Sequence, residues 1–282
     1  MTTLTERVQQ LKEKWPAYTE ILQFYEQVRA AQLAAKESLV IQPVKTAEQW
    51  AVHLAEGLSM IRKEDFIVDI VSSTELFHTL CRIGKTTTPL MANQIDKISG
   101  LLADKRLHLE KILTAGADDQ STEKLAVDLG LEPKILSFLI TNSIRPSVES
   151  GAEHLRNKIA STRWHHNRCP VCSSPPALNL LKDQGGKRYS LCSYCACQWR
   201  IERLSCAVCG NTEQDKLSYF CGEDEEAHRI DLCDVCDYYI KTIDYRTLED
   251  SDPFLEDLAT LHLDVLAADK GYQKLMPSCW NI

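Results

Sequence analysis

Apolar residues in the first half of the chain recur at helical spacing. Steps of four, three and four residues separate the first apolar stripe, which consists of Leu4, Val8, Leu11 and Trp15. The same periodicity predicts further helices over residues 16–42, 50–61, 66–84 and 88–116. Uniform helical periodicity with short polar links is typical of an all-α domain, which we place at residues 1–160.

Two stretches of this half carry other signals. Residues 122–136 have the spacing of a helix-turn-helix, with Gly130 at the turn, but Lys134 is the one basic residue of the second helix. One cation is too little to hold a phosphate backbone, so we interpret the stretch as two core helices joined by a glycine turn. Residues 141–168 are rich in turn formers in their first part and predict a hinge between the two halves of the chain.

The pattern changes to strands after residue 168. Segments 177–181 and 187–191 flank Asp183-Gln-Gly-Gly, which predicts a β-hairpin with glycines in its turn. Segments 217–220 and 229–232 flank an acidic turn in the same way. A Cys-x-x-Cys pair stands before and after each hairpin, so the arrangement knuckle, hairpin, knuckle occurs twice.

The four pairs predict two metal sites. The eight paired residues are Cys169, Cys172, Cys192, Cys195, Cys206, Cys209, Cys233 and Cys236. A two-residue gap lets one tight turn direct two thiolates at one ion, and two such turns complete a tetrahedral site. Because each hairpin brings its own two knuckles together, we expect sequential pairing rather than a cross-brace. Four thiolates suit zinc and iron alike, so both metals stay open.

Four further cysteines lie outside this spacing. They are Cys81, Cys197, Cys221 and Cys279, and we interpret them as small buried or neutral residues because each predicted site already has four thiolates. For Cys197, which lies close to the first site, a spare ligand or a reactive thiol is the alternative. Trp164, His165 and His166 precede the first knuckle, and we assign the histidines to packing and polar contacts for the same reason. Residues 198–204 predict a strand that joins the two modules rigidly, and residues 252–271 predict a helix packed on the second module.

Charge is distributed unevenly along the chain. Residues 150–209 carry nine basic and three acidic residues, a balance of +6, whereas residues 210–282 carry six basic and 17 acidic residues, a balance of −11. An acidic final third repels nucleic-acid phosphates. The chain has no secretory signal pattern and no apolar run long enough to span a bilayer, so we expect a cytoplasmic protein with reduced thiols and no membrane insertion.

The cysteine-rich stretch resembles a known family. Cys169-Pro-Val-Cys-Ser-Ser-Pro-Pro, Cys192-Ser-Tyr-Cys, Cys206-Ala-Val-Cys-Gly and Cys233-Asp-Val-Cys-Asp-Tyr-Tyr, in this order, are similar to the formate dehydrogenase accessory protein family, FdhE. The resemblance covers residues 169–275, and Ser173 stands where the family often has glycine. It implies a multidomain protein: an all-α domain followed by two rubredoxin-like or zinc-ribbon modules and a C-terminal helix. We place the modules at residues 161–204 and 205–282.

The resemblance also implies a function. Members of the family bind iron or zinc through these cysteines and assist the maturation of formate dehydrogenase by binding its catalytic subunit. We find no nucleophile elbow, phosphate loop or metal-hydrolase motif, and a closed four-thiolate site has no open position, so we expect no enzyme and no small-molecule substrate.

Two alternatives come from other classes of protein. A zinc-ribbon nucleic-acid binder would use the basic stretch together with Trp164, Tyr189, Tyr194 and Trp199 for base stacking. A rubredoxin-like protein would use an iron centre for electron transfer or oxygen sensing.

Overall fold

The computed structural model describes residues 2–39, 50–116, 119–159, 164, 166–223, 225–248, 251–276 and 280. Two compact units share the chain, and each draws on several stretches of sequence. The first comprises Met1–Leu22, Lys45–Arg62 and Leu155–Pro277, and the second comprises Gln23–Val44, Lys63–His154 and Ser278–Ile282. The domain boundaries inferred from the sequence stay a prediction.

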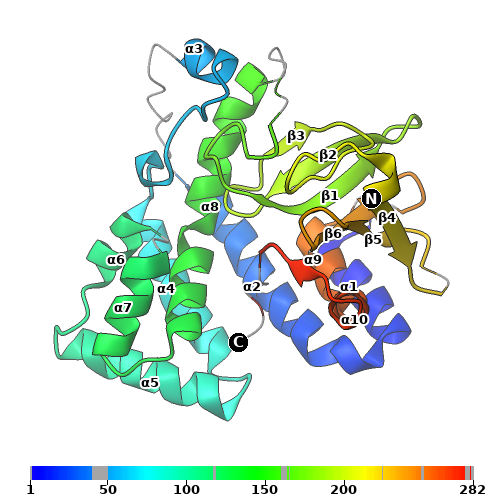
Figure 1. Ribbon diagram of the computed structural model, residues 1–282. Helices are drawn as coiled ribbons and strands as arrows, with labels where there is room; N and C mark the ends of the chain where they lie inside the picture. Colours follow the sequence, from blue (N-terminus) through cyan, green and yellow to red (C-terminus); the bar gives the residue numbers. More distant parts are fainter. Residues whose placement is uncertain are drawn as a thin grey trace. The chain divides into compact units, whose positions relative to one another are not determined.

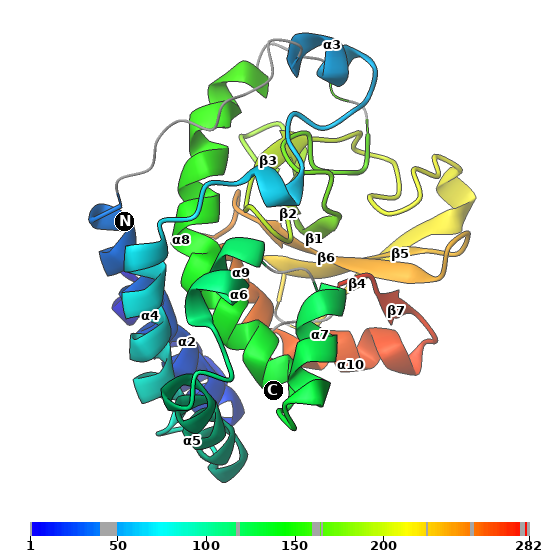
Figure 2. The same ribbon diagram turned by 90° about the vertical axis from the view of Figure 1, so that its left-hand side faces the viewer.

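The second unit is helical. Its helices are α2 (Thr19–Glu37, which starts in the first unit), α4 (Ile70–Gly84), α5 (Pro89–Ala103), α6 (Leu109–Ala115), α7 (Asp119–Asp128) and α8 (Pro133–Ile159, which ends in the first unit). Figure 2 shows α4 to α7 around the long α8. Large apolar side chains fill this core, among them Phe77, Ile95, Leu113 and Leu136. The prediction of a helical region is confirmed.

Helix boundaries follow the capping signals. Asp69 caps α4 through the Ser72 N–H at 3.0 Å, and Thr88 caps α5 through the Met91 N–H at 3.2 Å. The predicted helix over residues 88–116 is two helices, because the chain turns at residues 104–108, where Lys105 has a φ of 56°. Gly130, with a φ of 68°, separates α7 from α8, as the glycine-turn interpretation expected.

The predicted hinge at residues 141–168 is wrong for most of its length, because residues 141–159 belong to α8. Its polar residues bond within the helix: Asn142 Nδ2 donates to the Phe138 carbonyl at 2.9 Å, and Ser143 Oγ donates to the Leu139 carbonyl at 2.6 Å. Arg145 pairs with Glu149 one turn later at 2.8 Å. In this buried helix, side chains that often form turns therefore make their hydrogen bonds to carbonyl groups of the preceding helical turn.

The first unit contains one continuous sheet. Its strands are β1 (Pro176–Lys182), β2 (Lys187–Cys192), β3 (Gln198–Arg200), β4 (Leu217–Cys221), β5 (His228–Cys233), β6 (Tyr238–Asp244) and β7 (Gln273–Lys274). Along the sheet the order is β3-β2-β1-β6-β5-β4, with β7 beside β6 (Figure 1). Parallel pairing of β1 with β6 joins the two predicted hairpin modules side by side. The strand predicted over residues 198–204 is shorter, because β3 ends at Arg200. The rigid connection between the modules is therefore made by the pairing of β1 with β6.

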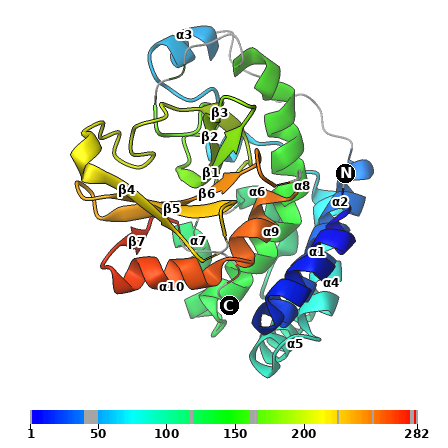
Figure 3. The ribbon, with the colours of Figure 1, turned by 90° about the vertical axis from the view of Figure 1, so that its right-hand side faces the viewer.

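Two short helices lie against the second module. The predicted helix over residues 252–271 is divided into α9 (Pro253–Leu258) and α10 (Leu261–Asp269) (Figure 3). Leu263 and Ala267 of α10 pack with Ile230, Leu232 and Tyr239 of the sheet, as the sequence predicted for this helical segment. At the break between the two helices, Lys241 Nζ of β6 donates to the carbonyl groups of Asp257 and Thr260.

Three N-terminal elements belong to this unit: α1 (Leu4–Lys14), the 3-10 turn Pro16–Tyr18 and α3 (Trp50–Ala55). Thr3 and Glu6 form a capping box at the start of α1. The predicted helix over residues 50–61 ends early, and the chain then extends along the first knuckle. There the Met60 N–H donates to the Pro170 carbonyl at 2.9 Å, and the Ile61 N–H donates to the Val171 carbonyl at 3.0 Å.

Candidate metal centres

The four knuckles share one backbone geometry. Each residue that follows the second cysteine of a pair has a left-handed φ: 61° at Ser173, 54° at Ala196, 81° at Gly210 and 58° at Asp237. In three knuckles the N–H of the first cysteine donates to the carbonyl five residues later, at 2.8–2.9 Å. This tight turn holds the two thiols of a pair on one side of the chain.

The first centre consists of Cys169, Cys172, Cys192 and Cys195, all of them buried. The Sγ atoms of Cys172 and Cys192 lie 3.5 Å apart, and Cys195 Sγ lies 3.6 Å from those of Cys169 and Cys172. Cys206, Cys209, Cys233 and Cys236 form the second centre. There the pairs Cys206–Cys236 and Cys209–Cys233 both lie at 3.8 Å. The grouping is sequential, as the hairpins predicted.

These separations fit a bound ion. An ion that binds four thiolates at about 2.3 Å in a tetrahedron places neighbouring sulfurs about 3.8 Å apart. The sulfur–sulfur distances given above, 3.5–3.6 Å in the first centre and 3.8 Å in the second, are close to this edge, and all four sulfurs of each centre lie within 4.8 Å of one another. Each centre could therefore hold one zinc or iron ion with four thiolates and no further ligand.

Backbone amides support the thiolates. The Cys195 N–H donates to Cys192 Sγ at 3.4 Å, and the Val208 N–H donates to Cys206 Sγ at 3.3 Å. Such hydrogen bonds stabilise negative charge on sulfur. Both centres therefore present thiolates from a preformed turn.

The thiols of the first centre have strongly displaced pKa values. Burial raises the pKa of Cys169, Cys192 and Cys195 well above the ordinary range, whereas hydrogen bonds from the neighbouring thiols lower that of Cys172. In the second centre burial raises the pKa of Cys206 to about 11. A cation is therefore needed to hold four thiolates together at neutral pH, and its binding releases protons.

The two centres differ in exposure. All four cysteines of the first are buried, whereas in the second Cys209 is exposed and Cys236 is half-buried. A cavity of about 270 Å³ adjoins the second centre, and Cys206 and Cys233 are among its lining residues. Solvent or a partner can therefore reach the second centre.

The remaining cysteines stay outside both groups. Cys197 is 6% exposed, and its Sγ donates weakly to the Gln198 carbonyl at 3.7 Å. Cys221 is exposed on β4. Cys81 is buried in α4, where desolvation raises its pKa to about 12. Cys279 and His165 lie outside the described residues.

Aromatic residues beside the first knuckle serve packing. Trp164 and Trp199 are only 8% and 2% exposed. The Trp164 indole N–H donates to the Arg168 carbonyl at 2.8 Å, and that of Trp199 donates to the His166 carbonyl at 3.1 Å. The His166 ring lies against Trp164, with centroids 4.8 Å apart. Two of the four rings considered for base stacking are thus buried.

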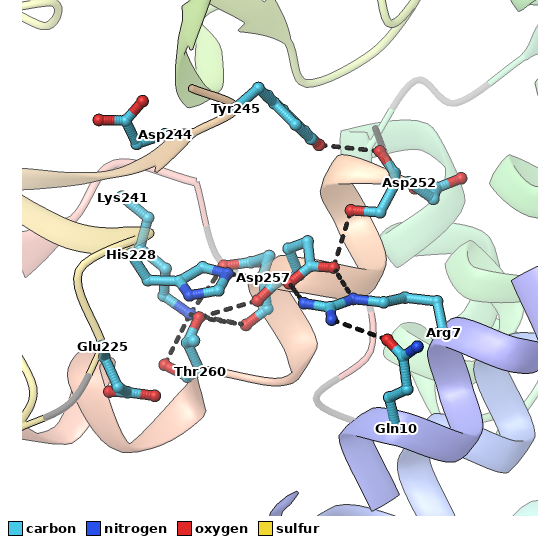
Figure 4. Close-up of polar contacts among 12 residues, drawn as sticks. Arg7, Gln10, Glu225, His228, Lys241, Asp244, Tyr245, Asp252, Asp257 and Thr260 are labelled. Atoms are coloured by element: carbon cyan, nitrogen blue, oxygen red, sulfur yellow. Dashed lines mark hydrogen bonds and ion pairs between the residues drawn. The ribbon is translucent and has the colours of Figure 1, made fainter. Parts of the chain in front are cut away.

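A polar network under the second module was not foreseen from the sequence (Figure 4). Glu256 of α9 is fully buried and accepts from Arg7 Nε of α1 at 2.7 Å and pairs with His228 Nε2 of β5 at 2.9 Å. Although burial opposes it, these hydrogen bonds lower the pKa of Glu256 to about 2. Arg7 and Glu256 are 249 residues apart, and no local pattern links them.

A second part of the network surrounds Lys241, whose ammonium group is buried. Its Nζ donates to the carbonyls of Asp257 at 2.7 Å and Thr260 at 2.9 Å, and it pairs with Asp264 at 2.8 Å. A cation at the C-terminal carbonyls of α9 is favourably placed. The network therefore fixes the terminal helices to the strands that carry the second centre.

Comparisons with known proteins agree over the cysteine-rich stretch. The sequence model of the FdhE central domain matches residues 168–203, and that of the FdhE C-terminal domain matches residues 204–279. No described helix has both the length and the apolar character needed to cross a membrane.

Relatives extend the similarity. An FdhE homolog of Aquifex aeolicus is 27% identical over 274 residues, covering 95% of this chain and 91% of the relative. One of Stutzerimonas stutzeri is 35% identical over 113 residues, covering 39% of this chain but only 37% of the relative. Over 98% of its length the chain superposes on 93% of the crystal structure of FdhE from Pseudomonas aeruginosa, with a TM-score of 0.71 and 22% identity. That likeness establishes the fold.

Proposed function

We propose that the chain belongs to the FdhE family and is a cytoplasmic, metal-binding accessory protein that assists the maturation of formate dehydrogenase by binding its catalytic subunit. One observation carries the proposal: both four-cysteine groups lie within the stretch that the FdhE domain models match. The eight cysteines named above are the proposed ligands of two ions. Four thiolates would complete the tetrahedron around each ion, so the ions would act as parts of a rigid platform rather than as sites for a substrate.

Capture of the catalytic subunit tests the proposal. The tagged chain should retain formate dehydrogenase catalytic subunit from a mixture with unrelated proteins, and Cys221→Ser should retain it equally because this exposed thiol lies outside both centres. Cys192→Ser should lose both an ion and the capture. Retention no greater than that of an unrelated bait would contradict the proposed function.

A one-electron redox role is the second candidate, and the exposure of Cys209 favours it, since an electron-transfer centre must lie near the surface. The absorption spectrum of anaerobically purified protein separates the two. Ferric iron in a four-thiolate site is coloured and loses its colour on reduction, whereas zinc is colourless and has no redox chemistry. A colourless protein with two zinc ions would end the redox candidate and leave the assembly role intact.

A further inference from the structure

The first module borders a large basic cavity. It has a volume of about 1340 Å³, and we call it the basic groove. Six cationic residues line it: Arg156, Lys182, Lys187, Arg188, Arg200 and Arg203. Asp183 and Glu202 are the acidic residues of the lining, so the groove has a clear excess of positive charge. An anionic ligand is expected to be drawn to it.

The edge of the sheet also faces the groove. Among the described strands β3 is the last on this side, and Gln198, Trp199 and Arg200 all contribute to the groove lining. Hydrogen bonds of Cys192 with Cys197 and of Ile201 with Arg188 set the register, and Trp199 is opposite Ser190. By the alternation of an antiparallel pair, the backbone groups of Gln198 and Arg200 point away from β2, towards the outer edge. An extended peptide can pair with such an edge.

A fixed cation lies in the lining of the groove. The Arg188 side chain is 4% exposed, and it donates to the Ser205 carbonyl at 2.6 Å and to Asp231 at 2.9 Å. Its buried Nε has no hydrogen-bond partner in the described part of the chain. Because Asp231 belongs to β5, this guanidinium also connects the groove to the second module.

The chemistry favours a polypeptide over a nucleic acid. The indole rings of Trp164 and Trp199 are buried, which leaves them unable to stack with bases. The outer edge of β3, beside which no other described strand lies, offers N–H and C=O groups in the spacing of another strand, whereas a phosphodiester chain cannot pair with it in this way. The ligand class that uses both the edge and the charge is an acidic peptide in extended conformation.

We propose that the basic groove binds an extended acidic segment of the partner protein, which adds to the outer edge of β3. This proposal rests on the accessory function, which supplies the partner protein, and it identifies the basic groove as the surface that binds this partner. Acidic side chains at every second position of the added strand would point to one face of the sheet and lie among the groove cations. Backbone pairing would supply affinity, and the cations would select the acidic sequence.

Peptide binding by the full-length protein tests the groove. The probe is a fluorescent decapeptide of alternating Glu and Thr. The triple variant Lys187→Glu/Arg200→Glu/Arg203→Glu, called the groove variant, should bind this peptide about 100-fold more weakly than wild type at low salt. A control with the same change of net charge is Lys97→Glu/Lys111→Glu/Lys124→Glu, whose three exposed lysines lie in the other unit, and it should bind within about twofold of wild type. Equal weakening in both variants would overturn the proposal.

A second peptide tests the strand pairing. The same Glu-Thr decapeptide with every backbone nitrogen methylated has the same charge but no backbone N–H groups, so we expect it to bind about tenfold more weakly. Equal binding of the two peptides would overturn the addition to β3. A ten-nucleotide single-stranded DNA provides the alternative ligand. If it binds more tightly than the acidic peptide, and if only the groove variant loses this binding, the ligand of the groove is a nucleic acid and the peptide proposal is wrong.

Capture of the catalytic subunit separates this proposal from the proposed function. If wild type captures the subunit and the groove variant captures it equally well, the groove proposal fails and the accessory function stands. If wild type captures no subunit but binds the acidic peptide through the groove, the accessory function fails and peptide binding stands. Retained metal content and thermal midpoint in the groove variant show that its fold is intact, and Lys187→Gln/Arg200→Gln/Arg203→Gln repeats the test if it is not.

Discussion

The two metal centres arise from the same repeat but are supported differently. In the first, all four cysteines are buried, and residues 60–61 donate two backbone hydrogen bonds to the knuckle carbonyls of Pro170 and Val171. In the second, Cys209 is exposed, while the strands behind the centre are fixed to α9 and α10 by Glu256 and Lys241. Ligand set alone therefore does not determine how tightly an ion is enclosed.

This difference suggests different roles for two chemically equivalent sites. A buried ion cannot be removed before the surrounding backbone opens, so its loss is coupled to unfolding of the module. An ion beside an exposed thiolate can exchange or react while the fold persists. We therefore expect the first centre to serve as a structural anchor and the second to be the responsive one.

The largest expected effect comes from a ligand of the first centre. Cys192→Ser should lose one metal equivalent and destabilise the first module by about 4–5 kcal/mol or more, because metal binding contributes directly to folding. Metal analysis and denaturant unfolding measure both quantities. Cys209→Ser should also lose one equivalent but with a smaller loss of stability, and Cys221→Ser should change neither. Full metal content in Cys192→Ser would show that the assignment is wrong.

Acid should act on the support of the second centre. The pKa of Glu256 is lowered to about 2, so its contribution of about 3 kcal/mol is complete above pH 4.5 and is lost as the pH falls from 4.5 towards 2. Glu256→Gln should therefore be less stable than wild type at pH 7, and this difference should shrink over that window. Denaturant unfolding at a series of pH values measures it, with the exposed Glu123→Gln as control. A difference independent of pH would contradict the charge assignment.

Metal exchange should distinguish the two centres directly. Release of zinc to a chromogenic chelator should occur in two phases, with the second centre faster by about tenfold, because exposed sites open more readily. In Cys209→Ser only the slow phase should remain. One uniform phase in wild type would show that the difference in exposure has no consequence for the bound ion.

The sequence determined the local parts of this picture. Cys-x-x-Cys spacing and the two hairpins led to the sequential grouping that the structure has, and the turn residues led to the correct strand positions. These features depend on residues a few positions apart. The same local reasoning was wrong at residues 142 and 143, because Asn and Ser side chains have two uses, in turns and in bonds within a buried helix.

Long-range features had no local signal. Parallel pairing of β1 with β6 depends on strands more than 50 residues apart, and both are apolar enough to pair with other strands. The Arg7–Glu256 pair joins the two ends of the chain. Residues 58–61 continue the apolar spacing of a helix, but Gly57, with a φ of 76°, ends α3 and turns the chain towards the first knuckle. Tertiary contacts decide these features, and one sequence does not show them.

The smallest expected effect concerns the knuckle backbone. Ala196 of the first centre and Gly210 of the second occupy the same left-handed position, with φ values of 54° and 81°. An L side chain is strained there by about 1–2 kcal/mol, so Ala196→Gly should stabilise the first module by up to about 1 kcal/mol after the entropy that glycine adds to the unfolded chain. Gly210→Ala should destabilise the second by about 1 kcal/mol, and its Cβ would also come within 3.0 Å of the Asn167 side chain. Denaturant unfolding measures both changes. A gain of stability in Ala196→Gly together with a loss in Gly210→Ala would support the same knuckle geometry in both centres. A loss of stability in Ala196→Gly would instead show that the methyl group of Ala196 is needed for packing.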